Sequence, residues 1–357
     1  MKPKVYFIEL KDGATPAKQA EAMKKLYDFA GVSSIVSEHD FVAIKVHVGE
    51  EGNTTYMKPE VVKVLADEIK AKGGLAFLTE TSTLYKGERS NAVKHLLHAH
   101  KRGFGMDCMG IPFIMSDGLL GNSEREVTIN GELHEKVEIA SEITGTDVVM
   151  SVSHVTGHIV TGLGACIKNL GMGLASRKGK RQQHSSMHPS IKDSCVLCRK
   201  CMQWCPADAI IEKDKKAWIV QEKCIGCGEC LTACRYDAVG FDWGAEAGYT
   251  QKSMTEHALG VIKGKKSFFF NLLLDMTKDC DCWNVAQEKL IPDIGIIASN
   301  DPVAIDMASL DITLKHNRNT IAQMSYGNQN ALIQIDHGVK IGLGSKEYEL
   351  VMVSSDQ

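Results

Sequence analysis

The sequence predicts an α/β fold: a mostly parallel-sheet host domain interrupted by a small α+β domain. Over the first part of the chain, short β-branched or apolar runs alternate with amphipathic helical stretches, which is typical of parallel strands joined by helices. The same alternation resumes after residue 244. A cysteine-rich segment separates the two. We therefore expect a host domain over 1–189 and 244–357, with the small domain over 190–243 inserted into it.

The first host segment is expected to contain five strands that lead into polar residues or loops. They are KVYFIEL, FVAIKVHV, LAFLTE, IPFIMSD and TDVVMSVSH, and helices are expected over about 16–30, 58–72 and 92–100. Pro16 suits the first turn of a helix, and the Asn130-Gly131 pair in REVTINGELHE predicts a hairpin turn.

The second host segment is expected to continue the same domain. It contains a helix over about 253–263, the strands KSFFFNLLLDM and DIGIIASN, a helix near 328–336 and the strand YELVMVS. Asp301 before Pro302 is suited to begin a further helix, which Asp306 is expected to flank. Neither flank is complete alone, which favours an insertion over the alternative of three consecutive domains.

Eight of the twelve cysteines form an internal repeat. CVLCRKCMQWCPADAI begins at residue 195 and CIGCGECLTACRYDAV at residue 224. In a Cys-x2-Cys-x2-Cys loop three thiolates surround one 4Fe-4S cluster, and the next cysteine ligates the partner cluster. We expect two 4Fe-4S clusters, one held by Cys195, Cys198, Cys201 and Cys234 and the other by Cys224, Cys227, Cys230 and Cys205.

The segment between the two cysteine runs, AIIEKDKKAWIVQ, predicts a β-hairpin. With this hairpin and the repeat, residues 190–243 resemble a bacterial-type two-cluster ferredoxin domain. The alternative is a zinc ribbon. Zinc takes four ligands per site, however, and has no need of three evenly spaced cysteines with a distant fourth, repeated.

Several polar residues follow strands of the host domain. Lys45 and His47 share one face at the end of FVAIKVHV, His154 ends VVMSVSH, and Lys168 follows in the glycine-containing segment TGLGACIKNLGMG. Open α/β sheets bind ligands beyond the carboxyl ends of their strands. A single histidine there is more often a satisfied core or surface group, but two at strand ends favour a ligand site. We expect Lys45, His47, His154 and Lys168 to be catalytic.

Cys280 and Cys282 follow an apolar strand and flank Asp281. Residues i and i+2 of an extended chain point the same way, so we expect the two thiols to form an extra metal or redox site. The alternative is a pair of cysteines that pack as small hydrophobes.

Three further features are expected to be structural. Cys108 and Cys166 carry no spacing signal and are assigned to the core. The basic run from Arg177 to Arg181 is interpreted as a solvated linker, with a phosphate or carboxylate site as the alternative.

Bulk properties argue against several classes of protein. A net charge of −3 and a pI near 6.5 give no reason to expect nucleic acid or a membrane surface as partner. The N-terminal apolar run is too short for a signal peptide, and SFFFNLLLDM has about half the length of a membrane span, so we expect a cytoplasmic protein. Neither a G-x-G-x-x-G after a strand nor a P-loop occurs.

Four stretches carry a family resemblance: AIKVHVGEEGNTTYMKPEVV, SHVTGHIVTGLGACIKNLGMG, KDCDCWN and IIASNDPVAID. In this order they resemble a widespread prokaryotic family known only as a domain of unknown function, often with a two-cluster ferredoxin insert. The resemblance covers nearly the whole chain and implies an iron–sulfur protein of redox metabolism. A more distant likeness to the nickel-dependent lactate racemase family carries no residues over.

We therefore expect an iron–sulfur electron-transfer protein. Electrons from a redox partner protein, either a ferredoxin- or flavodoxin-like carrier or a reductase, would pass through the two clusters to a small-molecule substrate on the host. The sequence does not decide that the chain is an enzyme, but a carrier needs little beyond 190–243, which favours an oxidoreductase. The alternatives are a regulatory or assembly protein and a metal-handling protein. A flavin or a further metal is left open.

Overall fold

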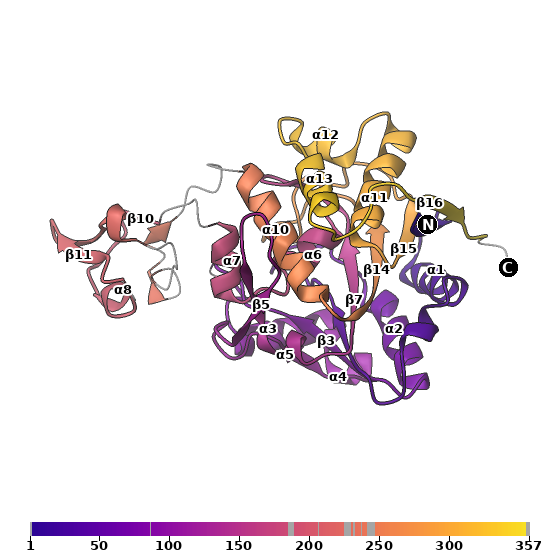
Figure 1. Ribbon diagram of the computed structural model, residues 1–357, viewed down its shortest axis with the longest axis horizontal. Coiled ribbons are helices and arrows are strands. Elements are labelled where there is room, and N and C mark those ends of the chain that lie inside the picture. Colours follow the sequence, from indigo (N-terminus) through magenta and orange to yellow (C-terminus); the bar gives the residue numbers. More distant parts are fainter. Residues whose placement is uncertain are drawn as a thin grey trace.

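The computed structural model describes residues 2–85, 87–184, 189–205, 207–224, 230, 233–236, 238–240 and 247–354. Its main body is an eight-stranded sheet with helices on both faces (Figure 1). The strand order is β16-β1-β15-β14-β7-β2-β3-β4. Neighbouring strands are parallel except where β15 pairs with β1 and with β14. The predicted α/β fold with a mostly parallel sheet is confirmed.

Both flanks of the cysteine-rich segment contribute strands to this sheet. The strands are β1 (Lys4–Glu9), β2 (Phe41–Lys45), β3 (Leu75–Glu80), β4 (Phe113–Met115), β7 (Val148–His154), β14 (Lys266–Leu273), β15 (Gly295–Ser299) and β16 (Glu349–Met352). Because β14 lies between β15 and β7, the second flank completes a sheet that the first flank begins.

Two short antiparallel pairs lie outside the large sheet: β5 (Glu124–Thr128) with β6 (Lys136–Ala140), and β8 (Thr156–His158) with β9 (Gly162–Gly164). The first pair is the hairpin that Asn130-Gly131 predicts. Its loop is longer than a two-residue turn, because the Gly131 N–H donates to the His134 carbonyl and the return strand begins only at Lys136.

The helices follow the predicted order, with some shifted ends. They are α1 (Pro16–Phe29), α2 (Pro59–Ala71), α3 (Ala92–Ala99), α4 (Met106–Met109), α5 (Ser141–Thr144), α6 (Cys166–Gly171), α7 (Arg177–Gln183), α8 (Lys200–Gln203), α10 (Ala247–Ile262), α11 (Pro302–Asn317), α12 (Ile321–Tyr326) and α13 (Leu332–Lys340), with short turns η1 (Val32–Ile35), η2 (His100–Phe104) and η3 (Gln221–Lys223). The helix expected near 328–336 is α13, which begins at Leu332, and it is preceded by an additional helix, α12, with a capping box between Thr320 and Gln323.

The sheet separates two hydrophobic cores, because successive residues of a strand point to opposite faces. Val42 and Ile44 of β2 pack on the side of α1 and α2, whereas Ala43 packs on the side of α6, α10 and α11. In β14, Phe269 faces the core beside α6, α10 and α11, whereas Phe268 and Phe270 face the core beside α1 and α2. Burial of each large side chain contributes roughly 1.5–3 kcal/mol, so these cores fix the strand positions that carry the site.

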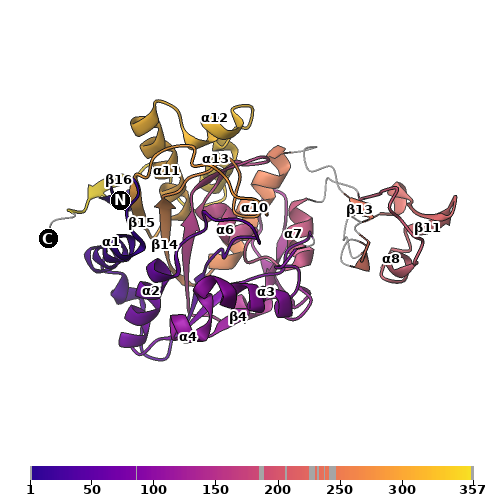
Figure 2. The ribbon, with the colours of Figure 1, turned by 180° about the vertical axis from the view of Figure 1, so that it is seen from behind.

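Residues 190–240, as far as they are described, form a small lobe set apart from the main body (Figures 1 and 2). In it, β10 (Ser190–Ile191) pairs with β13 (Val239–Gly240), and β11 (Ile210–Lys213) pairs with β12 (Lys216–Ile219) as the predicted hairpin. The lobe has its own core, formed by Cys201, Ile210, Ala217, Ile219, Cys230 and Val239. Residues 185–188 and 241–246, which flank the lobe in the sequence, lie outside the described residues.

Strand β16 pairs with β1 at one edge of the sheet, so the two ends of the described chain lie close together (Figure 1).

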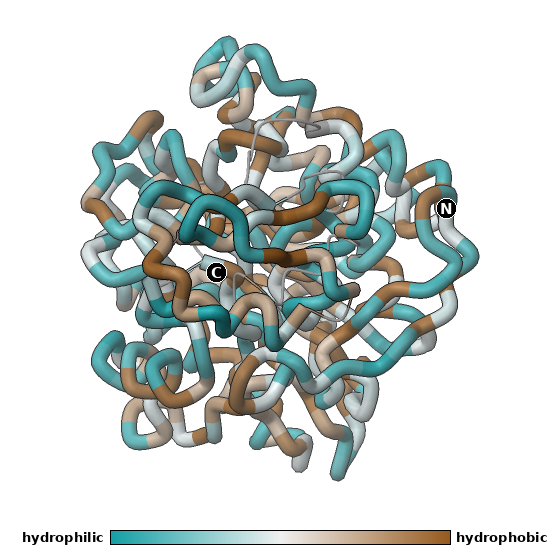
Figure 3. The backbone as a smooth tube through the Cα atoms, turned by 90° about the vertical axis from the view of Figure 1, so that its left-hand side faces the viewer, coloured by the Kyte–Doolittle hydropathy of each residue, from teal (hydrophilic) through white to brown (hydrophobic). Residues whose placement is uncertain are grey.

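Hydrophobic residues form short segments interrupted by hydrophilic ones (Figure 3). Within the described residues, no helix combines the length and the apolar character that crossing a membrane requires.

Candidate functional site

A cavity of about 550 Å³ opens where the neighbouring parallel strands β14, β7, β2 and β3 end. Strand β2 ends at Lys45, β3 at Glu80 and β7 at His154, and all three side chains line the cavity. This is the edge at which open α/β sheets bind ligands. The structure brings together here every host residue that the sequence singles out as catalytic or redox-active: Lys45, His47, His154, Lys168, Cys280 and Cys282.

Lys45 lies on the floor of the cavity and is almost fully buried. Its Nζ donates to the Asn169 Oδ1 at 2.7 Å and to the Val46 carbonyl. Burial lowers the pKa of Lys45 to about 8, although the nearby Glu80 carboxylate opposes the change. Lys45 can therefore gain and lose a proton near neutral pH.

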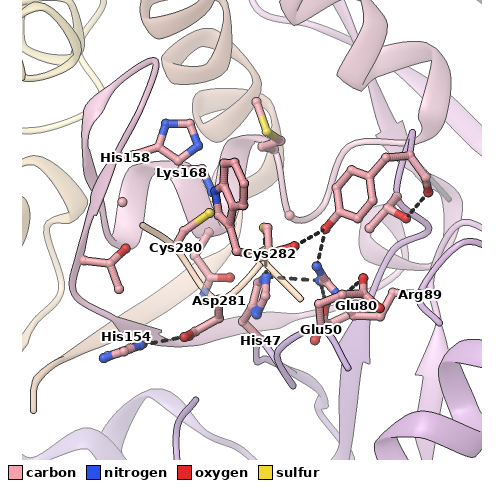
Figure 4. Close-up of a pocket in the computed structure, with 18 of the residues that line it drawn as sticks. His47, Glu50, Glu80, Arg89, His154, His158, Lys168, Cys280, Asp281 and Cys282 are labelled. Carbon is pink, nitrogen blue, oxygen red and sulfur yellow. Dashed lines mark hydrogen bonds and ion pairs between the residues drawn. The ribbon is translucent and has the colours of Figure 1, made fainter. Parts of the chain in front are cut away.

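Cys280 and Cys282 lie in the loop after β14 and point into the same part of the cavity (Figure 4). The chain here is a turn rather than the extended segment that the sequence predicts, since the Trp283 N–H donates to the Cys280 carbonyl at 3.2 Å. The turn nevertheless places both thiols on the lining of the same cavity, where each shifts the pKa of the other. The premise of extended backbone was wrong, but the expected convergence of the two sulfur atoms holds.

The two thiols have opposite acidities. The hydrogen bonds from Cys280 and His47 and the positive charge of Lys168 hold the pKa of Cys282 well below its usual value, against the effect of burial. The hydrogen bond to Cys282, together with burial, raises the pKa of Cys280 well above its usual value. Cys282 is therefore the more acidic thiol of the pair and Cys280 the less acidic one.

His47 links the thiol pair to an adjoining polar network. Its Nδ1 accepts a hydrogen bond from the Gly49 N–H at 3.1 Å, which assigns the ring proton to Nε2. The Nε2 lies 3.3 Å from the Cys282 Sγ, so this proton is directed at the thiolate. The Arg89 Nη1 lies 3.0 Å from the same nitrogen.

His154 holds the cysteine loop in place. Its Nδ1 lies 2.8 Å from the Asp281 Oδ2, and its Nε2 lies 2.7 Å from the Leu274 carbonyl, so both nitrogens face acceptors. Burial lowers the pKa of His154, but the Asp281 carboxylate and these hydrogen bonds outweigh it and raise the pKa overall. With both nitrogens engaged, His154 positions the loop through Asp281.

Sequence reasoning missed a buried ion-pair group on the other side of His47. Arg89 pairs with Glu50 and with Glu80, each at 3.3 Å (Figure 4). Glu80 ends β3 and could have been found by the strand-end rule that selected Lys45. Arg89 and Glu50 lie in loops, where nothing in the local sequence distinguishes them from solvated charges.

The small lobe contains a second, much smaller cavity of about 20 Å³. Its lining includes Cys195, Cys198, Cys201 and Cys234, the four cysteines predicted to share one cluster. Burial, together with the charges of the other three, raises the pKa of Cys201.

Equivalent cysteines of the two repeats also accept equivalent backbone hydrogen bonds. The Ala209 N–H donates to the Cys205 Sγ and the Ala238 N–H to the Cys234 Sγ, both at 3.3 Å. Of the second predicted set, Cys227 lies outside the described residues. Among the residues that are described, no three His, Cys, Asp or Glu side chains are grouped as ligands of a metal ion.

Comparison with known families identifies most of the chain. Residues 42–311 match the family described as domain of unknown function DUF362. The chain belongs to the DUF362 family. The predicted membership in a family of unknown function is thereby confirmed, whereas the match does not test the predicted clusters. No curated protein matches the chain.

Two solved structures resemble the DUF362 protein distantly. The lactate racemase apoprotein from Thermoanaerobacterium thermosaccharolyticum is 12% identical, with a TM-score of 0.36 over 74% of this chain and 50% of that one. A protein from Thermotoga maritima is 13% identical, with a TM-score of 0.43 over 82% of this chain and 57% of that one. The DUF362 chain thus spans about half the length of either protein.

Two structural expectations for the DUF362 chain were wrong. The basic run is not a solvated linker: it forms helix α7, in which Arg177, Lys180 and Arg181 are buried against the main body. Lys180 lines the host cavity, and burial lowers its pKa to about 7. Cys108 is exposed rather than in the core, because it lies in the short surface helix α4, whereas Cys166 is buried as expected.

The two aspartates assigned to α11 have different roles. Asp301 caps this helix as predicted, accepting from the Val303 and Ala304 N–H groups. Asp306 points instead from α11 to the beginning of α6, where it accepts from the Cys166 and Ile167 N–H groups at 2.8 Å each. Asp306 therefore fixes the helix that carries Lys168.

Proposed function

We propose that this DUF362 protein is an iron–sulfur electron-transfer protein, a ferredoxin-type redox enzyme whose two 4Fe-4S clusters serve a reaction in the host cavity. The observation that carries the proposal is the small cavity lined by Cys195, Cys198, Cys201 and Cys234. Three of these come from the first repeat and one from the second, which is the set that crossed cluster ligation requires. Bound clusters would supply one-electron transfer between a redox partner protein and the host.

The chemistry of the lobe fits such clusters. Thiolates are their usual ligands, and backbone N–H groups that donate to the sulfur atoms, as at Cys205 and Cys234, tune their potential. The apolar side chains of Ile210, Ile219 and Val239 pack among the cysteines and limit access of water. The alternative of zinc does not account for three ligands from one loop with a fourth from the other.

The host cavity supports an oxidoreductase rather than a simple carrier. Reduction or oxidation of a small molecule usually moves protons with the electrons, so the site needs groups that exchange protons near neutral pH. Lys45 and Lys180 have pKa values of about 8 and about 7 and line one cavity with the Cys280–Cys282 pair. Its volume, about 550 Å³, suits a small-molecule ligand.

Anaerobic purification followed by metal analysis and electron paramagnetic resonance tests the proposal. Two 4Fe-4S clusters correspond to about eight iron atoms per chain and to a paramagnetic signal after reduction with dithionite. Because ligation is crossed, Cys195→Ser and Cys234→Ser should both weaken the signal of one cluster. Cys205→Ser and Cys224→Ser should both weaken the signal of the other cluster. Cys108→Ser, at an exposed thiol far from the repeat, is the control.

Two outcomes would overturn the proposal. One is zinc, rather than iron, at the eight thiols of anaerobically prepared protein. The other is an iron-containing protein in which Cys234→Ser affects the same component as Cys224→Ser, because each motif would then hold its own metal and the crossed arrangement would be absent.

A further inference from the structure

The Cys280–Cys282 pair has two features that a pair of packing cysteines does not need. Both thiols line the host cavity rather than a closed core, and they lie close enough for each to shift the pKa of the other. Cys280 is buried, whereas Cys282 is partly exposed to the cavity. One sulfur is therefore accessible to a ligand, and the other lies directly behind it.

The groups around Cys282 favour its thiolate form. The His47 Nε2–H is directed at the Sγ from 3.3 Å, and the ammonium group of Lys168 adds a positive charge nearby (Figure 4). The Asp281 between the cysteines is neutralised by His154, so that its negative charge is balanced. A thiolate stabilised in this way, with a second thiol close by, is the arrangement required for thiol–disulfide exchange.

We propose that Cys280 and Cys282 are a redox-active dithiol pair that reduces a small disulfide bearing a carboxylate group. The Cys282 thiolate attacks one sulfur of the substrate R–S–S–R, which forms a mixed disulfide and releases one thiolate RS⁻. Cys280 then loses its proton and attacks the Cys282 sulfur. This step closes the Cys280–Cys282 disulfide and releases the second thiolate. The substrate thus gains two electrons, and its two thiolates take up the Cys280 proton and one proton from water.

The preference for a substrate with a carboxylate group follows from the positive charges that line the cavity. Arg89 is matched by Glu50 and Glu80, and Lys45 donates to Asn169. Lys168 has no hydrogen-bonding partner in the described part of the chain, and the charges of Cys280, Cys282 and Asp281 raise its pKa against burial. Its ammonium group is therefore a cation available to an anionic ligand, and its charge also lowers the pKa of Cys282.

Reduction of the disulfide back to the dithiol takes up two electrons and two protons. Only this regeneration rests on the proposed function, in which reducing equivalents come from the redox partner protein through the lobe. The exchange itself depends on the two thiols alone and proceeds once in protein whose thiols are already reduced. The two proposals can therefore fail separately.

Peptide mass spectrometry of the full chain tests the exchange. Trypsin cleavage after Lys278 and Lys289 yields a peptide over 279–289 that contains Cys280, Cys282 and no other cysteine. We expect that anaerobic treatment with 3,3′-dithiodipropionate converts this peptide to an internal disulfide that resists later alkylation. Cys280→Ser should instead accumulate a mixed disulfide at Cys282, whereas Cys282→Ser should react at Cys280 at least roughly tenfold more slowly. The exposed thiol of Cys108 is the internal control.

The substrate class is tested by charge. 2-Hydroxyethyl disulfide has nearly the same shape as 3,3′-dithiodipropionate but no charge, and we expect it to react roughly tenfold more slowly, since a single ion pair in a partly buried site supplies about that factor. With Lys168→Met, the two reagents should react at equal rates, and the internal disulfide should still form.

Three outcomes would overturn the inference. The first is a 279–289 peptide that is still doubly alkylated after treatment of the wild type. The second is equal reaction of Cys280→Ser and Cys282→Ser, which would mean two ordinary thiols. Equal rates with the two reagents in the wild type would refute the carboxylate preference. An iron-free protein that still exchanges would contradict only the proposed function, and a protein with active clusters but no exchange would contradict only the dithiol pair.

Discussion

Replacement of Asp281 by Asn should strongly destabilise the host domain, although it changes only one charge. The Asp281 Oδ2 lies 2.8 Å from the His154 Nδ1, and both side chains are almost fully buried. Removal of one partner leaves a buried histidine cation without its counter-charge, which costs about 3–5 kcal/mol in such pairs. Because the histidine can release its proton and so avoid part of this cost, we expect a loss in free energy of unfolding of about 3 kcal/mol.

The chain offers a matched control for this substitution. Asp67 pairs with Lys63 over the same 2.8 Å, but both side chains are about half exposed on helix α2. Exposed pairs of this kind contribute about 0.3–0.5 kcal/mol. Asp67→Asn therefore makes the same chemical change at the same distance, but in an exposed i,i+4 pair whose partner is a lysine.

The effect of Asp281→Asn should depend on pH. The pKa of His154 is raised above its unfolded value, so its contribution to stability is complete below about pH 6.5 and is lost as the pH rises through the folded value. The pKa of Asp281 is lowered, so its contribution is lost in acid. The difference in free energy of unfolding between wild type and Asp281→Asn should thus be larger at about pH 6 than at about pH 9.

Urea denaturation followed by far-ultraviolet circular dichroism measures these differences. The wild type, Asp281→Asn, His154→Gln and the double variant form a cycle in which the pairwise coupling appears directly. Similar losses in Asp281→Asn and Asp67→Asn, or a loss that grows as the pH rises, would refute the assignment of a buried charged pair. In that case His154 would be a neutral ring and free to act on a ligand.

Three further predictions concern other parts of the host. Asp301→Ala should lower the free energy of unfolding by about 1–2 kcal/mol, because the cap of α11 is lost, and chemical denaturation would show it. Gly171→Ala should cost about 1–3 kcal/mol, because the added Cβ would overlap the Met254 carbonyl oxygen where α6 crosses α10; an unchanged melting temperature would contradict this. Lys45 lines the same cavity as Lys168, so its charge should add to carboxylate binding; this binding, measured by calorimetry, should weaken as the pH rises through about 8, where Lys45 loses its proton, and Lys45→Met should reduce this pH dependence.

The strand ends of the host site could be predicted because they depend on local pattern. The apolar run from Phe41 predicts a strand, and parallel strands end at a common edge, so Lys45 and His154 were placed together without knowledge of strand order. The sequence could not show that β14 lies next to β7, which brings the Cys280–Cys282 loop to the same edge. That adjacency depends on pairing between residues more than a hundred positions apart.

The errors have a common cause. The run from Arg177 to Arg181 has the composition of a linker, and only its packing against the loops around Thr83 and Leu120 buries it. Arg89 likewise gains its role from Glu50 and Glu80, which lie far away in sequence or in a different element. A charged residue in a loop has no periodic pattern, so its burial depends entirely on the segments that fold over it.

By itself, the sequence determined the elements of the sheet, the residues at their ends and the paired cysteine runs, because periodicity and spacing act within one strand, helix or loop. Tertiary structure alone decided that Cys280 and Cys282 face Lys168 and His47, that His154 is held by Asp281, and that α7 is buried. These features arise where loops from several strands meet in a low-dielectric cavity. There, the pKa of each group is set by neighbours that the local sequence does not contain.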